Sequence, residues 1–245
     1  MKPLFVIAIS AALVIVLIRV SNSSGLMGYW NFDEGSGSTV KDLSGKGNDG
    51  VWGGTQAGSN GYYTAGKIGN YAGYLNGSSN YVSISSHPVP HGGSAWPNFS
   101  VSGWVNIPTS SDCIVFADLL TSSGDNQTTG NFVLRIEAST NLLHGFVFTG
   151  NNTTPVAFNS SSPVPLNQWT HVAMVSQKRA ANITLYVNGV GSSVTSSQSY
   201  SAASRNLTYI GSDELSFFRG SIDDVRLYNR ALSAAEIQAI YNAQK

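Results

Sequence analysis

Apolar and polar residues alternate along most of the chain after residue 25. The alternation is clearest in Leu26–Phe32, Phe99–Val105 and Trp169–Val175, and it predicts strands with one face toward a core. Other segments of the same kind recur at a spacing typical of a sandwich: 73–77, 81–84, 113–119, 132–136, 142–148, 156–158, 183–189 and 207–210. We expect 73–77 and 81–84 to form a pair of strands, and Asn188-Gly189 to form a two-residue hairpin turn.

The period changes near the C-terminal end. Ile222–Tyr228 still reads as a strand, with Ile222, Val225, Leu227 and Tyr228 supplying apolar bulk. After it, Ser233 and Glu236 have the spacing of a capping box, and Ile237, Ile240 and Tyr241 fall on one stripe. We therefore predict a closing strand followed by one short helix.

Composition narrows the class of protein. The chain has 245 residues, of which 42% are hydrophobic, so one sizeable all-β domain is expected. Only 11% of the residues are charged and the formal net charge is zero, which argues against a nucleic acid or an anionic membrane face as partner. The single cysteine, Cys113, lies beside an apolar run, and we interpret it as a small buried hydrophobe.

Residues 1–25 differ from the rest. Lys2 precedes an apolar run over residues 4–18 that only Ser10 interrupts, and Arg19 with a polar string follows. This pattern predicts export, either by a signal peptide or by a short N-terminal membrane anchor, with cleavage left open. The globular domain is then residues 26–245, and its location is extracellular, secreted or anchored by residues 4–18.

Two blocks at opposite ends of the domain carry a family resemblance. Residues 28–37 read Gly-Tyr-Trp-Asn-Phe-Asp-Glu-Gly-Ser-Gly, and residues 222–232 read Ile-Asp-Asp-Val-Arg-Leu-Tyr-Asn-Arg-Ala-Leu. Together they resemble the laminin-G-like, concanavalin A-like lectin and glucanase superfamily. The resemblance implies an all-β, two-sheet antiparallel jelly-roll sandwich with one short C-terminal helix, and a first strand paired with the last.

The same resemblance implies a structural calcium ion at the edge where those strands meet. Its ligands would be Asp33, a carbonyl around Asn48, and Asp223, since hard oxygen donors favour calcium over transition metals. The alternative is that these aspartates only cap turns and accept from backbone amides. Strict alternation would turn Asp224 to the other face of the strand, where we expect it to pair with Arg226 or Arg230 in solvent.

The remaining candidates concern ligand binding and catalysis. Trp52, Tyr62 and Tyr63 lie in glycine-rich sequence and are the least core-like aromatic residues, so they are candidates for a glycan platform. No paired carboxylates of a glycoside hydrolase are recognisable, and His171 is interpreted as a hydrogen-bonded structural residue. We expect a non-catalytic extracellular domain that binds a glycan or polysaccharide. A structural or adhesive protein contacting cell-surface proteins is the alternative, and an unrecognised glycan-active enzyme the third.

Overall fold

The structure is a computed structural model that describes residues 24–86, 88, 98–119, 130–148, 155–177, 182–195 and 207–245. The predicted leader run over residues 4–18 lies outside these ranges. Within them, no helix has the length and apolar character needed to cross a membrane. The described chain forms two antiparallel sheets and one helix, α2 (Ala234–Gln244).

The two sheets have eight strands each. Sheet A runs in the order β14 (Val190–Thr195), β13 (Asn182–Val187), β12 (Thr170–Gln177), β7 (Phe99–Asn106), β16 (Arg219–Tyr228), β5 (Tyr71–Asn76) and β4 (Tyr63–Ala65), with β1 (Leu26–Trp30) also on β16. Sheet B runs in the order β11 (Pro155–Pro163), β10 (Leu142–Phe148), β9 (Gly130–Ile136), β8 (Cys113–Leu119), β15 (Leu207–Ile210), β6 (Tyr81–Ile84), β3 (Gly50–Gly53) and β2 (Thr39–Val40).

The predicted pairing of the first strand with the last is confirmed. β1 lies antiparallel to β16, with Leu26 opposite Tyr228 and Trp30 opposite Val225. The first strand ends at Trp30, earlier than the predicted Leu26–Phe32, and Phe32 beyond it takes a φ of 57°, outside the extended region. The strands predicted at 73–77 and 81–84 do not pair with each other, because β5 belongs to sheet A and β6 to sheet B.

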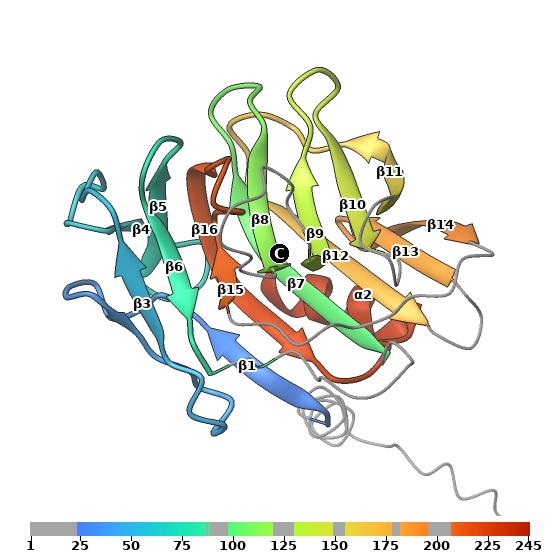
Figure 1. Ribbon diagram of the computed structural model, residues 1–245, viewed down its shortest axis with the longest axis horizontal. Coiled ribbons are helices and arrows are strands. Elements are labelled where there is room, and N and C mark those ends of the chain that lie inside the picture. Colours follow the sequence, from blue (N-terminus) through green and yellow to red (C-terminus); the bar gives the residue numbers. More distant parts are fainter. Residues whose placement is uncertain are drawn as a thin grey trace, which may run out of the picture.

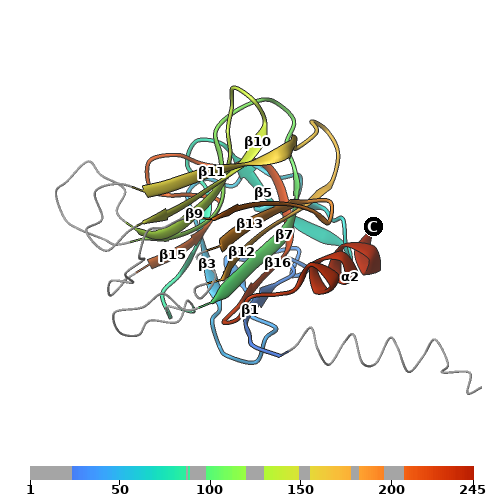
Figure 2. The same cartoon turned by 90° about the vertical axis from the view of Figure 1, so that its right-hand side faces the viewer.

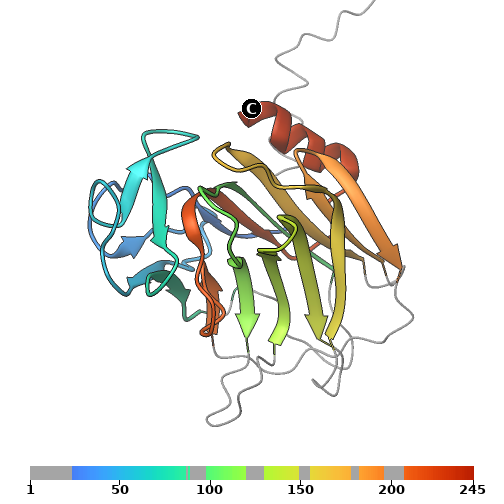
Figure 3. The same ribbon diagram turned by 90° about the horizontal axis from the view of Figure 1, so that it is seen from above.

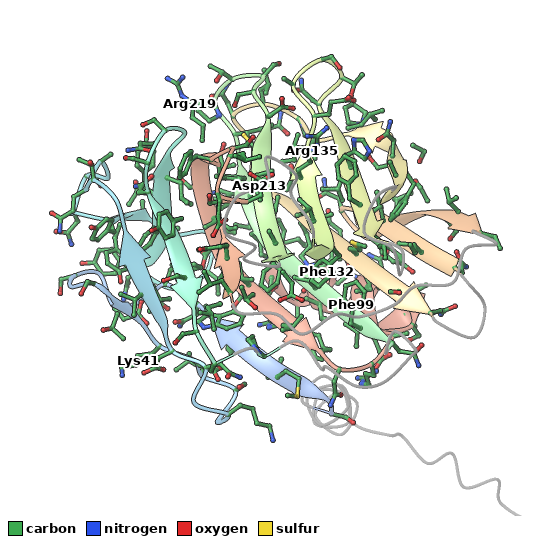
Figure 4. The ribbon with its side chains drawn as sticks, in the orientation of Figure 1. Lys41, Phe99, Phe132, Arg135, Asp213 and Arg219 are labelled. Carbon is green, nitrogen blue, oxygen red and sulfur yellow. The ribbon has the colours of Figure 1, made fainter. Side chains whose placement is uncertain are left out.

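The main core fills the space between the sheets, as the layers in Figure 2 indicate. Phe132 of β9 lies between two rings, stacked on Phe99 of β7 with centroids 4.4 Å apart and on Phe116 of β8 with centroids 5.7 Å apart. Figure 4 labels Phe99 and Phe132 close to each other. The Phe99–Phe132 pair joins the two sheets, and Phe116 extends it within sheet B, so the three rings fill the space between the layers.

Helix α2 covers the outer face of sheet A, and Figure 3 shows it outside the two sheet layers. Ile237 and Ile240 of the helix pack on Ala173, Val175 and Tyr228. The predicted capping box is present, since Ser233 Oγ accepts from Glu236 N–H and Glu236 Oε2 accepts from Ser233 N–H. Hydrogen bonds from Arg230 lower the pKa of Glu236 to about 2 and keep this cap ionised.

Candidate metal and ligand sites

Asp33 and Asp223 both hold the turn between β4 and β5. Asp33 Oδ1 accepts hydrogen bonds from the N–H groups of Asn70, at 2.7 Å, and Tyr71, at 3.0 Å. Asp223 Oδ2 accepts from the N–H groups of Lys67 and Ile68, each at 2.9 Å. The structure thus brings together two of the three predicted calcium ligands, one at each end of a single turn.

Asp223 is the carboxylate most in need of a further partner. Its side chain is fully buried, and its Oδ1 has no hydrogen-bond partner. Its pKa is raised to about 7, chiefly by burial and secondly by the charge of neighbouring Asp224, while backbone hydrogen bonds, those from Ile68 and Lys67 foremost, act to lower it. A buried carboxylate oxygen without a partner fits a hard cation, which would supply the missing positive charge. If bound here, calcium would be held by Asp223 Oδ1 and by loop oxygens near the turn.

Asn48 makes its contacts elsewhere. Its carbonyl accepts from Trp30 Nε1 at 2.9 Å, and its amide Nδ2 donates to the Met27 carbonyl at 2.6 Å. These bonds fix the loop after β2 to the first strand. In the described ranges, no group of three or more His, Cys, Asp or Glu side chains is arranged to hold a metal. Calcium at Asp33, Asn48 and Asp223 stays a prediction.

The face predicted for Asp224 is wrong. A register shift between Asp223 and Arg226 marks a β-bulge, and Asp224 takes a φ of 53° within it. Two residues, Asp223 and Asp224, therefore stand between the core-facing Ile222 and Val225, and the simple alternation fails. Asp224 does pair with Arg226, at 2.8 Å, but its side chain is buried rather than in solvent.

The aromatic residues Trp52, Tyr62 and Tyr63 belong to the core, so their expected exposure is wrong. Trp52 and Tyr62 stack with centroids 4.9 Å apart, and Tyr63 meets Trp52 edge-on at 5.9 Å. Trp52 is 4% exposed and Tyr63 is fully buried. The glycine-rich neighbourhood misled the prediction because glycines let the chain turn these rings inward. Ligand binding by these three residues stays a prediction. Their rings are buried and offer no exposed face to a sugar.

His171 and Cys113 are both buried. The expectation of a hydrogen-bonded His171 is wrong, since neither ring nitrogen has a partner in the described structure. The ring instead packs edge-on against Trp104, with centroids 5.5 Å apart, under Tyr241 of α2. Burial, and secondly the charge of Arg226, lower the pKa of His171 to about 3, so the imidazole is neutral near pH 7.

A cluster on the outer face of sheet B joins Phe146, an aromatic residue that the alternation already places on one face of its strand, to two residues that no sequence pattern links to it. Arg135 of β9 lies opposite His144 of β10, and Phe146 follows two residues later on the same face. The guanidinium carbon of Arg135 is 4.7 Å from the Phe146 ring centroid, and the His144 ring stacks on Phe146 at 4.2 Å. All three side chains are partly exposed. We call this group the Arg135 stack.

Groups beside the Arg135 stack extend the surface. Asp213, in the loop between β15 and β16, lies close enough that the charge of Arg135 lowers its pKa, although burial has the larger, opposite effect. Figure 4 marks Arg135 and Asp213 on the side of sheet B that faces the reader. Further along the face, Tyr81 meets Tyr209 edge-on at 5.5 Å and lies 6.4 Å from Phe217. Planar rings flanked by donors and acceptors are the usual make-up of a ligand surface.

The fold and its surfaces define a lectin-like jelly-roll domain. The chain belongs to the concanavalin A-like lectin/glucanases superfamily, whose model matches residues 76–238. The match includes the closing strand and the first turn of α2, and it confirms the family that the sequence resemblance indicated. No match was found among curated protein sequences.

Several solved structures share the fold. The binding domain of Paraclostridial Mosquitocidal Protein 1 superposes with a TM-score of 0.66 at 15% identity, over 91% of this chain and 53% of that one. Domain 4 of AbnA, an extracellular arabinanase from Geobacillus stearothermophilus solved with arabinotriose, has a TM-score of 0.61 at 21% identity, over 89% and 98%. The receptor-binding domain of botulinum neurotoxin type G has a TM-score of 0.60 at 16% sequence identity, and the match covers 90% of this chain and 52% of that one. The chain therefore spans about half the length of the toxin domains it resembles.

Proposed function

We propose that this chain is a non-catalytic, extracellular recognition domain that binds a glycan on the outer face of sheet B. The observation that carries the proposal is the Arg135 stack, a partly exposed set of planar groups that joins a guanidinium, an imidazole and a phenyl ring. Sugars present flat apolar faces and rings of hydroxyls, so they suit aromatic surfaces beside guanidinium and imidazole donors.

The placement of helix α2 favours this face. Sheet A has its outer side covered by Tyr241, Ile240 and Ile237 of the helix. The described helix does not cover sheet B, whose outer face turns toward the reader in Figure 1. Phe146 and His144 are partly exposed on this face, so a ligand could contact them there.

The likeness to domain 4 of the arabinanase supports a glycan as ligand, because that domain was solved with arabinotriose. Its sequence identity of 21% leaves the choice of sugar open. Export by the predicted leader would place the domain where polysaccharides are found. The proposed calcium ion would stabilise the turn held by Asp33 and Asp223. That turn joins two strands of sheet A, whereas the proposed ligand face belongs to sheet B.

The test is a glycan array, including arabino-oligosaccharides, probed with wild type, Phe146→Ala and Arg135→Ala in calcium and in chelator. We expect wild type to bind and each variant to lose about tenfold or more in affinity, the effect of about 1.4 kcal/mol at a central contact. Val51→Ala is the matched control, because Val51 is exposed on another strand of sheet B. Thermal melts confirm that each variant is folded.

Two outcomes would contradict the proposal in different ways. Failure of the wild type to bind any sugar would remove glycan recognition and favour a protein partner. Binding of wild type and both variants with equal affinity would keep the function but remove the Arg135 stack as its site.

A further inference from the structure

Strand β14 is an unusual edge for a sandwich. It ends the order of sheet A and, among the described strands, pairs only with β13. Figure 1 shows it at the right-hand margin of the molecule. Val190 is 61% exposed and Val194 is 40% exposed, which makes them two of the large hydrophobic residues that the described chain leaves in solvent.

Edge strands normally carry protection against pairing with other chains, and β14 has little of it. Known devices are short length, charge and proline. At the other edges, β2 has two residues, β4 has three, β11 begins and ends with proline, and the loop after β2 covers β1, with Leu43 N–H donating to the Tyr29 carbonyl. By contrast, β14 has six residues, Val-Gly-Ser-Ser-Val-Thr, without a charge or a proline.

The sequence of β14 is also self-complementary about Ser192. The hairpin turn Asn188-Gly189 is confirmed, with φ values of 51° and 80°, and it sets Val187 opposite Val190. In such a hairpin the residues next to the turn bond inward to the partner strand, and every second residue after them turns its N–H and C=O outward. Gly191 and Ser193 are then the residues free to bond a new strand.

We propose that β14 pairs antiparallel with β14 of a second copy of this chain, about a two-fold axis at Ser192. Gly191 of each copy would exchange hydrogen bonds with Ser193 of the other. Val190 would lie opposite Val194 of the second copy, at a position without hydrogen bonds, where side chains come closest. The same patch on both copies is what a two-fold interface requires.

The expected dimer is weak. One pair of six-residue strands buries far less than the roughly 1,200–2,000 Å² of a stable protein–protein interface. Dissociation constants in the range from about 10 µM to about 1 mM are therefore expected. The local concentration of copies held on one surface would exceed these dissociation constants. The pairing would then set the proposed ligand faces of two copies side by side.

The first test is sedimentation velocity of the full chain from about 1 µM to about 1 mM. Wild type should shift from monomer to dimer, and Val194→Lys should stay monomeric because two lysines would face valines beside the axis. Val51→Lys is the matched control, since Val51 is 51% exposed on the other sheet and should dimerise as wild type does. A wild type that stays monomeric, or a Val194→Lys variant that dimerises equally well, would overturn the proposal.

A second test maps the axis without relying on affinity. Within one copy the Ser192 hydroxyl bonds Ser161 of β11, and in the proposed register the two Ser192 residues face each other. Ser192→Cys would release the contact with Ser161 and bring the two thiols together, while the only native cysteine, Cys113, is buried. Under mild oxidation we expect a disulfide dimer in much higher yield than for Ser85→Cys, an exposed position at the end of β6. Equal yields from the two variants would place any contact away from Ser192 and overturn the register.

Discussion

Asp33 and Asp223 hold the two ends of the same turn, each through two backbone N–H groups. Asp33 follows the first strand and Asp223 lies in the last, so the turn between β4 and β5 ties the N-terminal and C-terminal strands together. The sequence offered two interpretations of these aspartates, as calcium ligands and as residues that cap turns. Both aspartates do cap a turn, and Asp223 Oδ1 is buried without a hydrogen-bond partner.

Calcium is predicted to raise the melting temperature through Asp223. A ligand bound only by the folded state at a hundredfold excess over Kd contributes about 2.7 kcal/mol, or roughly 5–10 °C for a domain of this size. Asp223→Asn should abolish the difference between calcium and chelator in a thermal melt. Asp49→Asn is the control, because Asp49 pairs with exposed Lys41 and should keep the full shift. Melting curves that are identical in calcium and chelator would exclude a stabilising ion.

Without calcium, Asp223 is predicted to make the protein less stable as pH rises. Its folded pKa of about 7 lies above the ordinary value of about 4, so the folded state binds the proton more tightly. The penalty is absent below about pH 4 and complete above about pH 7, with an upper bound of about 4 kcal/mol at about 1.4 kcal/mol per pKa unit. Urea unfolding across this range should show the slope in wild type, and Asp223→Asn should flatten it. A slope that persists in the variant would assign it to another group.

His171 is predicted to act in the opposite direction. Its folded pKa of about 3 lies below the ordinary value of about 6.5, so the unfolded state takes up the proton first. Stability from this residue is complete above about pH 6.5 and is lost as pH falls toward 3. His171→Phe should reduce acid sensitivity while keeping the contacts with Trp104 and Tyr241. His144→Phe, at a partly exposed position, should change the loss of stability at acid pH less than His171→Phe does.

Gly69 is predicted to be indispensable to the turn. It has a φ of 69°, and a Cβ there would lie 2.0 Å from Asp33 Oδ2. Gly69→Ala should therefore cost more than the roughly 1 kcal/mol of left-handed strain alone, because it also displaces the carboxylate. Gly37→Ala is the matched control, with a φ of 83° and no atom within 4 Å of its Cβ. Equal losses in urea unfolding would mean that the Asp33 contact does not matter.

The sequence was informative where the determining signal is local. Alternation located β7 and β12, and the capping residues Ser233 and Glu236 located α2, because both patterns depend only on near neighbours. The pairing of β1 with β16 came from the family resemblance of the end blocks rather than from any local pattern.

Features that depend on the register between strands, or on contacts between residues far apart in the sequence, were not predicted. The bulge at Asp224 adds one residue to the strand, and no local pattern announces its left-handed φ. The Arg135 stack exists only because Arg135 of β9 falls opposite His144 of β10. Trp52 is buried because Phe32, Tyr62 and Tyr63 surround it, and these contacts arise from the folded arrangement.

The pairing of β1 with β16 has a mechanical consequence. The chain enters the domain at Gly25, whose carbonyl accepts from Asn229 N–H, and Arg230 Nε donates to the Ser24 carbonyl. A pull applied between residue 24 and helix α2 therefore acts on one end of the ladder, where Leu26 faces Tyr228. The hydrogen bonds of an antiparallel pair that is loaded from one end break one after another. Tension along that line would peel away the first strand while leaving sheet B, with its proposed ligand face, in place.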